Sequence, residues 1–206
     1  MTLAVLASLA DAGFFVAFMH AILPTHWLPF VLVGREQRWS AGKTLGVAAL
    51  ASLGHVAFTV LIGAVVVGIG MVAAPQLDQY FKWVVAGLLV ALGVFYLTRE
   101  AHRHPDAPKR YLSDRAAVAG LVLLLTLSPC EAFFGVYSAA IKHGWGAFAL
   151  LSLVLLTTTV AAMLLFTGLT LAGARFIKLE ALQARESALL GWALILMAGA
   201  VVIFDF

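Results

Sequence analysis

Six long apolar runs fill most of this 206-residue chain. A helix needs about 20 consecutive apolar residues to cross the hydrocarbon core of a bilayer. The runs reach about that length, and the segments between them are short. The sequence therefore predicts an all-α integral membrane protein with six transmembrane helices in a single membrane domain, residues 1–206. The runs cover approximately residues 3–33, 42–72, 79–98, 116–141, 145–173 and 187–204.

The composition indicates that lipid is part of the solvent of this chain. Hydrophobic residues make up 63% of the sequence and charged residues 11%, whereas a soluble domain carries roughly 25% charged residues. The net charge is +3, but the charges bracket the apolar runs, so nucleic acid is not an expected partner. The first run lacks a positively charged leader and a small-residue cleavage site, which favours a first helix over a removed signal peptide.

Lys and Arg are distributed unequally between the predicted loops. Eleven of the 13 follow the first, third and fifth runs, and only Lys82 and Lys142 lie on the other side. Loops rich in Lys and Arg stay in the cytoplasm. We therefore expect a multi-pass protein of the cell (inner) membrane with both termini on the periplasmic or extracellular side.

The two halves of the chain resemble each other at an offset of about 105 residues. Pro24 aligns with Pro129, and His26 aligns with Glu131. Proline breaks or kinks a helix, so we expect helices 1 and 4 to be broken. Three helices per half give an inverted-topology repeat, a transporter plan that places the binding site at the midplane. The predicted division is repeat 1 at 1–98, a cytoplasmic loop at 99–115 and repeat 2 at 116–206.

Ionisable side chains within the runs gather near these two prolines. His20 and His26 are separated by about 240° of rotation in an ideal helix, so they would lie on different faces. A break near Pro24 would let both imidazoles point at one centre, and His55 could supply a third nitrogen from the second run. Imidazole binds divalent Zn, Cu, Fe and Ni. The pattern predicts a metal site inside the membrane.

Two residues of the second half complete the predicted metal set. Glu131 would supply an anionic oxygen and Cys130 a soft sulfur ligand. Packing is the alternative role for Cys130, and an interhelical hydrogen bond is the alternative role for His55. Polar side chains that could line a cavity or couple transport to a second ion are Asp11, Thr25, Thr158 and Thr159.

At these residues the chain resembles the nickel/cobalt transporter and exporter group of the LysE-like membrane superfamily. The segment HAILPTH, residues 20–26, is similar to an H-A-x-x-x-x-H element of that group. The letters LGH that end at His55 and SPC that end at Cys130 are similar to two further elements, in the same order. The resemblance implies metal transport rather than catalysis, with His20, His26 and His55 as ligands.

The sequence departs from that group at specific positions. Leu23 and Thr25 stand where the uptake branch has aspartates, and Glu131 stands where the exporter branch has a second proline. Of the exporter's histidine-rich loop, only His102 and His104 are present. The metal is therefore left open among Ni, Co, Zn, Mn and Fe.

These observations predict a secondary transporter, with export favoured, whose substrate is a divalent transition-metal ion. It would be no enzyme and would hold no permanent cofactor; its partners would be the bilayer and the metal ion, and homo-oligomers stay open. One alternative is a membrane-embedded metal- or haem-binding redox protein. Another is a relative of the superfamily's thiol-electron carriers that has lost its cysteine pair, because Cys130 is the single cysteine and Thr25 stands at the matching position of the first half.

Overall fold

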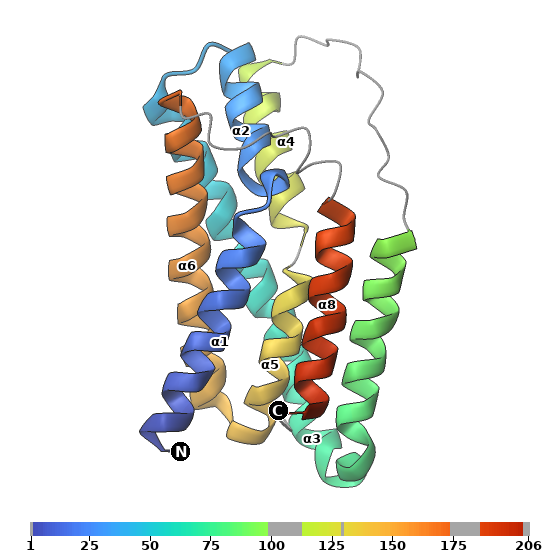
Figure 1. Cartoon of the computed structure of the whole chain (residues 1–206). Helices are drawn as coiled ribbons and strands as arrows, with labels where there is room; N and C mark the ends of the chain where they lie inside the picture. Colours follow the sequence, from blue (N-terminus) through green and yellow to red (C-terminus); the bar gives the residue numbers. More distant parts are fainter. Residues whose placement is uncertain (1, 99–112, 129, 174–185, 204–206) are drawn as a thin grey trace.

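The computed structural model describes residues 2–98, 113–128, 130–173 and 186–203, and in this part the chain is all-helical (Figure 1). The predicted all-α class is therefore confirmed for the described residues. The helices are α1 (Leu3–Ala21), α2 (Pro24–Glu36), α3 (Ala41–Thr98), α4 (Asp114–Thr126), α5 (Glu131–His143), α6 (Trp145–Leu171) and α8 (Glu186–Ile203).

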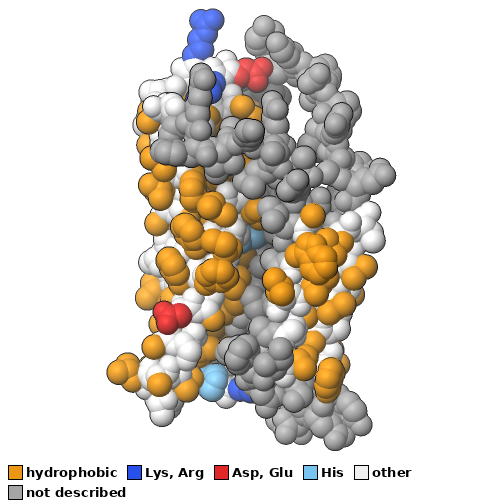
Figure 2. Space-filling model, viewed as in Figure 1, with side chains coloured by type: hydrophobic (Ala, Val, Ile, Leu, Met, Phe, Trp, Pro, Cys, Tyr) orange, Lys and Arg blue, Asp and Glu red, His pale blue; other side chains and the backbone are white. Residues whose placement is uncertain are grey.

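Three helical segments are long and apolar enough to cross a membrane: Leu3–Ala21, Ala41–Val72 and Trp145–Leu171. Only 22–39% of the apolar window in each segment is buried inside the protein. Figure 2 shows hydrophobic side chains over much of the visible described surface, with Lys and Arg toward its ends. An apolar surface of this extent indicates association with a membrane.

Two of the predicted apolar runs, 42–72 and 79–98, fall within the single element α3. At 1.5 Å per residue, a straight helix of 58 residues would measure about 87 Å. Figure 1 shows instead that α3 turns back on itself, so that its second arm runs beside α8. The two backbones approach closely there, because a Cβ atom on Gly93 would lie 2.8 Å from the Gly191 carbonyl oxygen.

The first predicted run forms two helices. α1 ends at Ala21, and α2 begins at Pro24 after Leu23, whose backbone is extended (φ −63°, ψ 133°). Proline suits the first position of a helix because the amide hydrogen it lacks would have no partner there. The indole of Trp27 donates a 3.1 Å hydrogen bond to the carbonyl of Ile22, which lies between the two helices.

The fourth predicted run also corresponds to two helices, α4 and α5. α4 ends at Thr126 and α5 begins at Glu131. Pro129, the expected helix break in this half, lies outside the described residues. Figure 1 shows α1 followed by α2 running in one direction along the bundle and α4 followed by α5 running in the other.

An aromatic cluster packs α5 and α6 against α3. Phe133 and Tyr137 meet edge to face at 4.9 Å between ring centroids, and Tyr137 lies at the same distance from Phe148. Gly63 of α3 faces Tyr137, since a Cβ atom there would come within 2.6 Å of the ring carbon Cδ2. Small residues at such contacts let helices approach closely, which is how membrane helices gain packing energy in lipid.

A polar contact joins the start of α3, and the turn before it, to the start of α4. Lys43 and Asp114 form an ion pair at 2.5 Å, and the indole of Trp39 donates a hydrogen bond to the same carboxylate. The hydrogen bond from Lys43, with that from Trp39, lowers the pKa of the Asp114 carboxyl below its usual value. Both charged residues are exposed, so this pair adds little stability and mainly fixes the geometry of the helix ends.

Candidate metal centre

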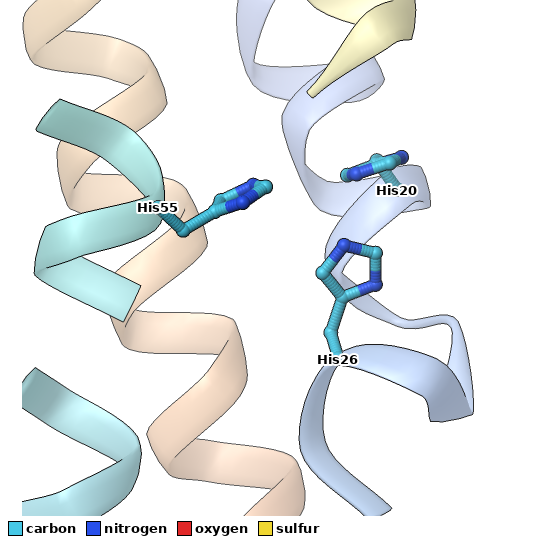
Figure 3. Close-up of side chains that lie close together, drawn as sticks. All are labelled: His20, His26 and His55. Atoms are coloured by element: carbon cyan, nitrogen blue, oxygen red, sulfur yellow. The ribbon is translucent and has the colours of Figure 1, made fainter. Parts of the chain in front are cut away.

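Three histidines from three helices converge inside the bundle (Figure 3). His20 lies in the last turn of α1, His26 is the third residue of α2, and His55 lies in α3. Each can offer one ring nitrogen such that the three atoms lie within 4.8 Å of one another. Among the described His, Cys, Asp and Glu residues, this is the group whose donor atoms gather closely enough to hold a metal ion.

The geometry of the rings follows from their positions around one centre. The ring centroids of His20 and His26 lie 4.3 Å apart, those of His26 and His55 lie 5.5 Å apart, and those of His20 and His55 lie 6.1 Å apart. Figure 3 shows His20 and His26 on one side and His55 reaching toward them from α3.

The local fold at Pro24 explains how His20 and His26 meet. In an uninterrupted helix, residues six apart lie on different faces. Here the extended backbone of Leu23 separates α1 from α2, and the amide of His26 bonds to the carbonyl of Leu23 rather than to Ile22. The change of direction turns His26 toward His20.

Burial separates these imidazoles from solvent. His55 is fully buried, and His26 is 6% exposed. His20 is less buried as a residue, but both of its ring nitrogens are enclosed. A site of this kind excludes bulk water and leaves the protein to supply the ligands.

The His55 ring has two backbone hydrogen-bond partners, Leu125 and Ser128, and the contact with Leu125 indicates which nitrogen can bind a metal. Its Nδ1 lies 3.2 Å from the carbonyl oxygen of Leu125. A carbonyl oxygen only accepts, so Nδ1 must carry the hydrogen in this contact. The lone pair then resides on Nε2, which is buried and makes no hydrogen bond within the described part of the chain. A ligating histidine commonly donates its second ring N–H to a backbone carbonyl in the same way.

His20 and His26 also have nitrogen atoms directed to the centre. Neither Nδ1 nor Nε2 of His20 finds a hydrogen-bond partner among the described residues. Nδ1 of His26 lies 3.3 Å from the hydroxyl of Thr25. The interhelical hydrogen bond considered for His55 is present, from its Nδ1 to the Leu125 carbonyl of α4. His20 has no such bond among the described residues, and a buried polar atom without a partner costs about 1–3 kcal/mol.

The donor set fits a borderline divalent ion. A metal bound tetrahedrally at about 2.1 Å would place its nitrogen ligands about 3.4 Å apart. The nitrogens lie within 4.8 Å of one another, so movements of about 1 Å would close them around an ion. Three neutral imidazoles leave the ion's charge uncompensated. The carbonyl end of α1 brings partial negative charge to this region, and the amide end of α2, which begins at Pro24, brings partial positive charge.

The remaining predicted site residues occupy different positions. Cys130 is buried in the apolar cluster of Phe133 and Tyr137 and is not part of the histidine group. Asp11 on α1 is exposed and is likewise not part of it.

The threonine candidates are divided between surface and interior. Thr25 is exposed, although its hydroxyl contacts His26, and Thr158 and Thr159 are buried on α6. Glu131 is the first residue of α5, and its side chain lies outside the described part of the protein. The same holds for the loop that carries His102 and His104.

Two residues with a clear role at this centre were not predicted. The indole of Trp27 satisfies the carbonyl freed between α1 and α2, and the carbonyl of Leu125 orients His55. Trp27 follows His26 directly, so a proline break with an adjacent buried indole is a signal that could have identified it. The contact of Leu125 joins residues 70 apart in the sequence, and no local pattern indicates it.

Comparison with protein-family models, with curated proteins and with solved structures found no match.

Proposed function

We propose that this protein is a secondary transporter of a divalent transition-metal ion, and that His20, His26 and His55 bind the ion in transit. The observation that carries the proposal is the convergence of three imidazoles whose donor nitrogens lie within 4.8 Å of one another. Three of their ring nitrogens are buried without a partner in the described protein. A bound ion would use lone pairs that the fold otherwise leaves unused.

The proposal includes six membrane spans arranged as a three-plus-three inverted repeat. Helices α1 and α2 form one interrupted span, and α4 and α5 form a second that runs in the opposite direction (Figure 1). The start of α1 and the end of α8 lie at the same end of the bundle (Figure 1), which supports an even number of spans. Interrupted helices that face each other at mid-membrane are the usual setting of a transporter's ion site.

The composition of the site favours release as well as binding. A proton and a metal ion compete for the same imidazole lone pair. A proton gradient could therefore expel metal on the more acidic side, which favours export. We propose Glu131, at the start of α5, as an anionic group that enters the site during transport.

The chemistry of the ligands limits the substrate to ions that accept imidazole. Nickel and cobalt are the ions implied by the resemblance of the HAILPTH, LGH and SPC elements to the nickel/cobalt transporter and exporter group. Zinc and iron also suit imidazole ligands, whereas manganese prefers oxygen ligands and would depend on Glu131.

A flux assay in proteoliposomes tests the proposal. Purified protein is reconstituted, and the movement of Ni, Co, Zn, Mn and Fe is followed with and without a pH gradient. We expect flux of at least one ion, with a strong loss in the variants His26→Ala and His55→Ala. His143→Ala, an exposed histidine at the end of α5, serves as the matched control and should transport normally. Flux that is unchanged in both site variants would refute the proposal.

The same preparation separates transport from a resident metal centre. A transported ion should be removed by a chelator and readily replaced. Metal or haem that survives a chelator wash, without any flux, would favour the alternative of a membrane-embedded redox protein.

A further inference from the structure

His55 lies against the last turn of α4, at the point where the second half of the chain meets the first. Its Nδ1 lies 3.2 Å from the carbonyl of Leu125, and the amide of Ser128 also bonds to that oxygen. The last four carbonyls of a helix have no partner within the helix. The Leu125 oxygen is therefore available to a side chain from α3 because α4 ends at Thr126.

A close contact beside this hydrogen bond sets the distance between the two helices. Gly54 precedes His55, and Thr126 follows Leu125. A Cβ atom on Gly54 would overlap the Thr126 hydroxyl and would lie 3.3 Å from both Cβ and Cγ2 of that residue. A side chain at position 54 would therefore force either the Thr126 side chain or the end of α4 to shift.

We propose that the last turn of α4 is a positioning element for the metal site, in which the contact of Gly54 with Thr126 holds the Leu125 carbonyl against His55. The carbonyl fixes the hydrogen on Nδ1 and leaves the lone pair of Nε2 for the ion. Movement of the α4 end would break this hydrogen bond and release the ring. The end of α4, in the second half of the chain, thereby orients His55, a proposed metal ligand in the first half. That His55 binds an ion rests on the proposed function.

Two variants and a matched control isolate the contact. Gly54→Ala introduces the overlap, and Gly54→Ala combined with Thr126→Ala removes the hydroxyl and Cγ2 that cause it. Gly46→Ala places the same substitution two helical turns earlier in α3, where a Cβ atom meets nothing within 4 Å.

The first readout is the tautomer of His55 in the metal-free protein, measured by ¹⁵N NMR of histidine-labelled protein and assigned with His55→Ala. We expect the Nδ1–H tautomer in the wild type, in Gly46→Ala and in the double variant, and a mixture or the Nε2–H tautomer in Gly54→Ala. The second readout is the affinity for Ni²⁺ or Co²⁺. Loss of an orienting partner commonly weakens metal binding about 10–100-fold, and we expect that loss in Gly54→Ala and its recovery in the double variant.

Each result bears on a separate part of the inference. An Nε2–H tautomer in the wild type would overturn the positioning role, even if Gly54→Ala fails to fold. A Gly54→Ala variant that binds metal as tightly as Gly46→Ala would also overturn it. If the wild type has the expected tautomer but binds no metal, the proposed transport function fails while the orientation of His55 by α4 stands.

Discussion

Replacing His20 with leucine should stabilise the metal-free protein and abolish metal binding. Both ring nitrogens of His20 are buried and lack a hydrogen-bond partner within the described residues. Each such atom costs about 1–3 kcal/mol, so removing both can return up to about 2–6 kcal/mol. Loss of the 4.3 Å ring contact with His26 and the change in shape offset about 1.5 kcal/mol of this. A net rise of about 0.5–4.5 kcal/mol in the free energy of unfolding is expected.

The single cysteine provides the assay. Cys130 is fully buried, so a thiol-reactive dye should label it only when the protein opens. Labelling during a denaturant titration in detergent then gives the free energy of unfolding for wild type and His20→Leu. His143→Leu replaces an exposed histidine and should change neither stability nor metal binding.

A destabilised His20→Leu variant would refute this reasoning. A loss comparable to the 2–5 kcal/mol of a typical Leu→Ala core truncation would mean that the imidazole supports the fold. His20 would then be a structural residue, and the argument that the fold carries an unfavourable site for the sake of a ligand would fail.

Three further outcomes test the surrounding structure. Trp27→Phe leaves the Ile22 carbonyl without its 3.1 Å donor and should lower the free energy of unfolding by about 1–3 kcal/mol in the dye assay. The pKa of Asp114 is lowered in the folded protein. Its stabilising contribution is therefore present above the unfolded pKa of about 3.9 and is lost as pH falls through the lower folded pKa. Unfolding followed as a function of pH should show a smaller loss of stability in acid for Asp114→Asn than for the wild type. Gly63→Ala would press on an aromatic ring of α5 and should lower the stability of the folded protein by about 1–3 kcal/mol. Gly68→Ala meets its nearest ring at 3.8 Å and should leave stability unchanged. Thermal unfolding measures both effects.

Hydropathy and proline placement were sufficient to predict the helical class and the meeting of His20 with His26. Apolar length decides whether a segment can be a helix in lipid, and Pro24 sits between the two histidines. Both facts are local, so the sequence expresses them directly. The predicted run 42–72 agrees closely with the apolar segment Ala41–Val72. Hydropathy also separated this run from 79–98, although both belong to one helical element, α3, which turns back on itself (Figure 1).

Contacts between residues far apart in the sequence could not be predicted from the sequence alone. The sequence left Cys130 open between a metal ligand and a packing residue, and it lies in an apolar cluster with Phe133 and Tyr137. Its small, soft side chain suits either environment, so packing around it decides. The Leu125 carbonyl could not be predicted at all, because every residue carries a carbonyl and only the end of α4 makes this one available.

The stoichiometry of exchangeable metal in the purified protein tests the central claim most directly. Equilibrium dialysis against Ni, Co, Zn, Mn and Fe, followed by elemental analysis, is expected to find one chelator-removable ion per chain for at least one metal. Binding should be lost in His20→Leu, His26→Ala and His55→Ala and retained in His143→Leu. A wild-type protein that binds none of the five metals, or binding that survives all three site substitutions, would contradict the claim.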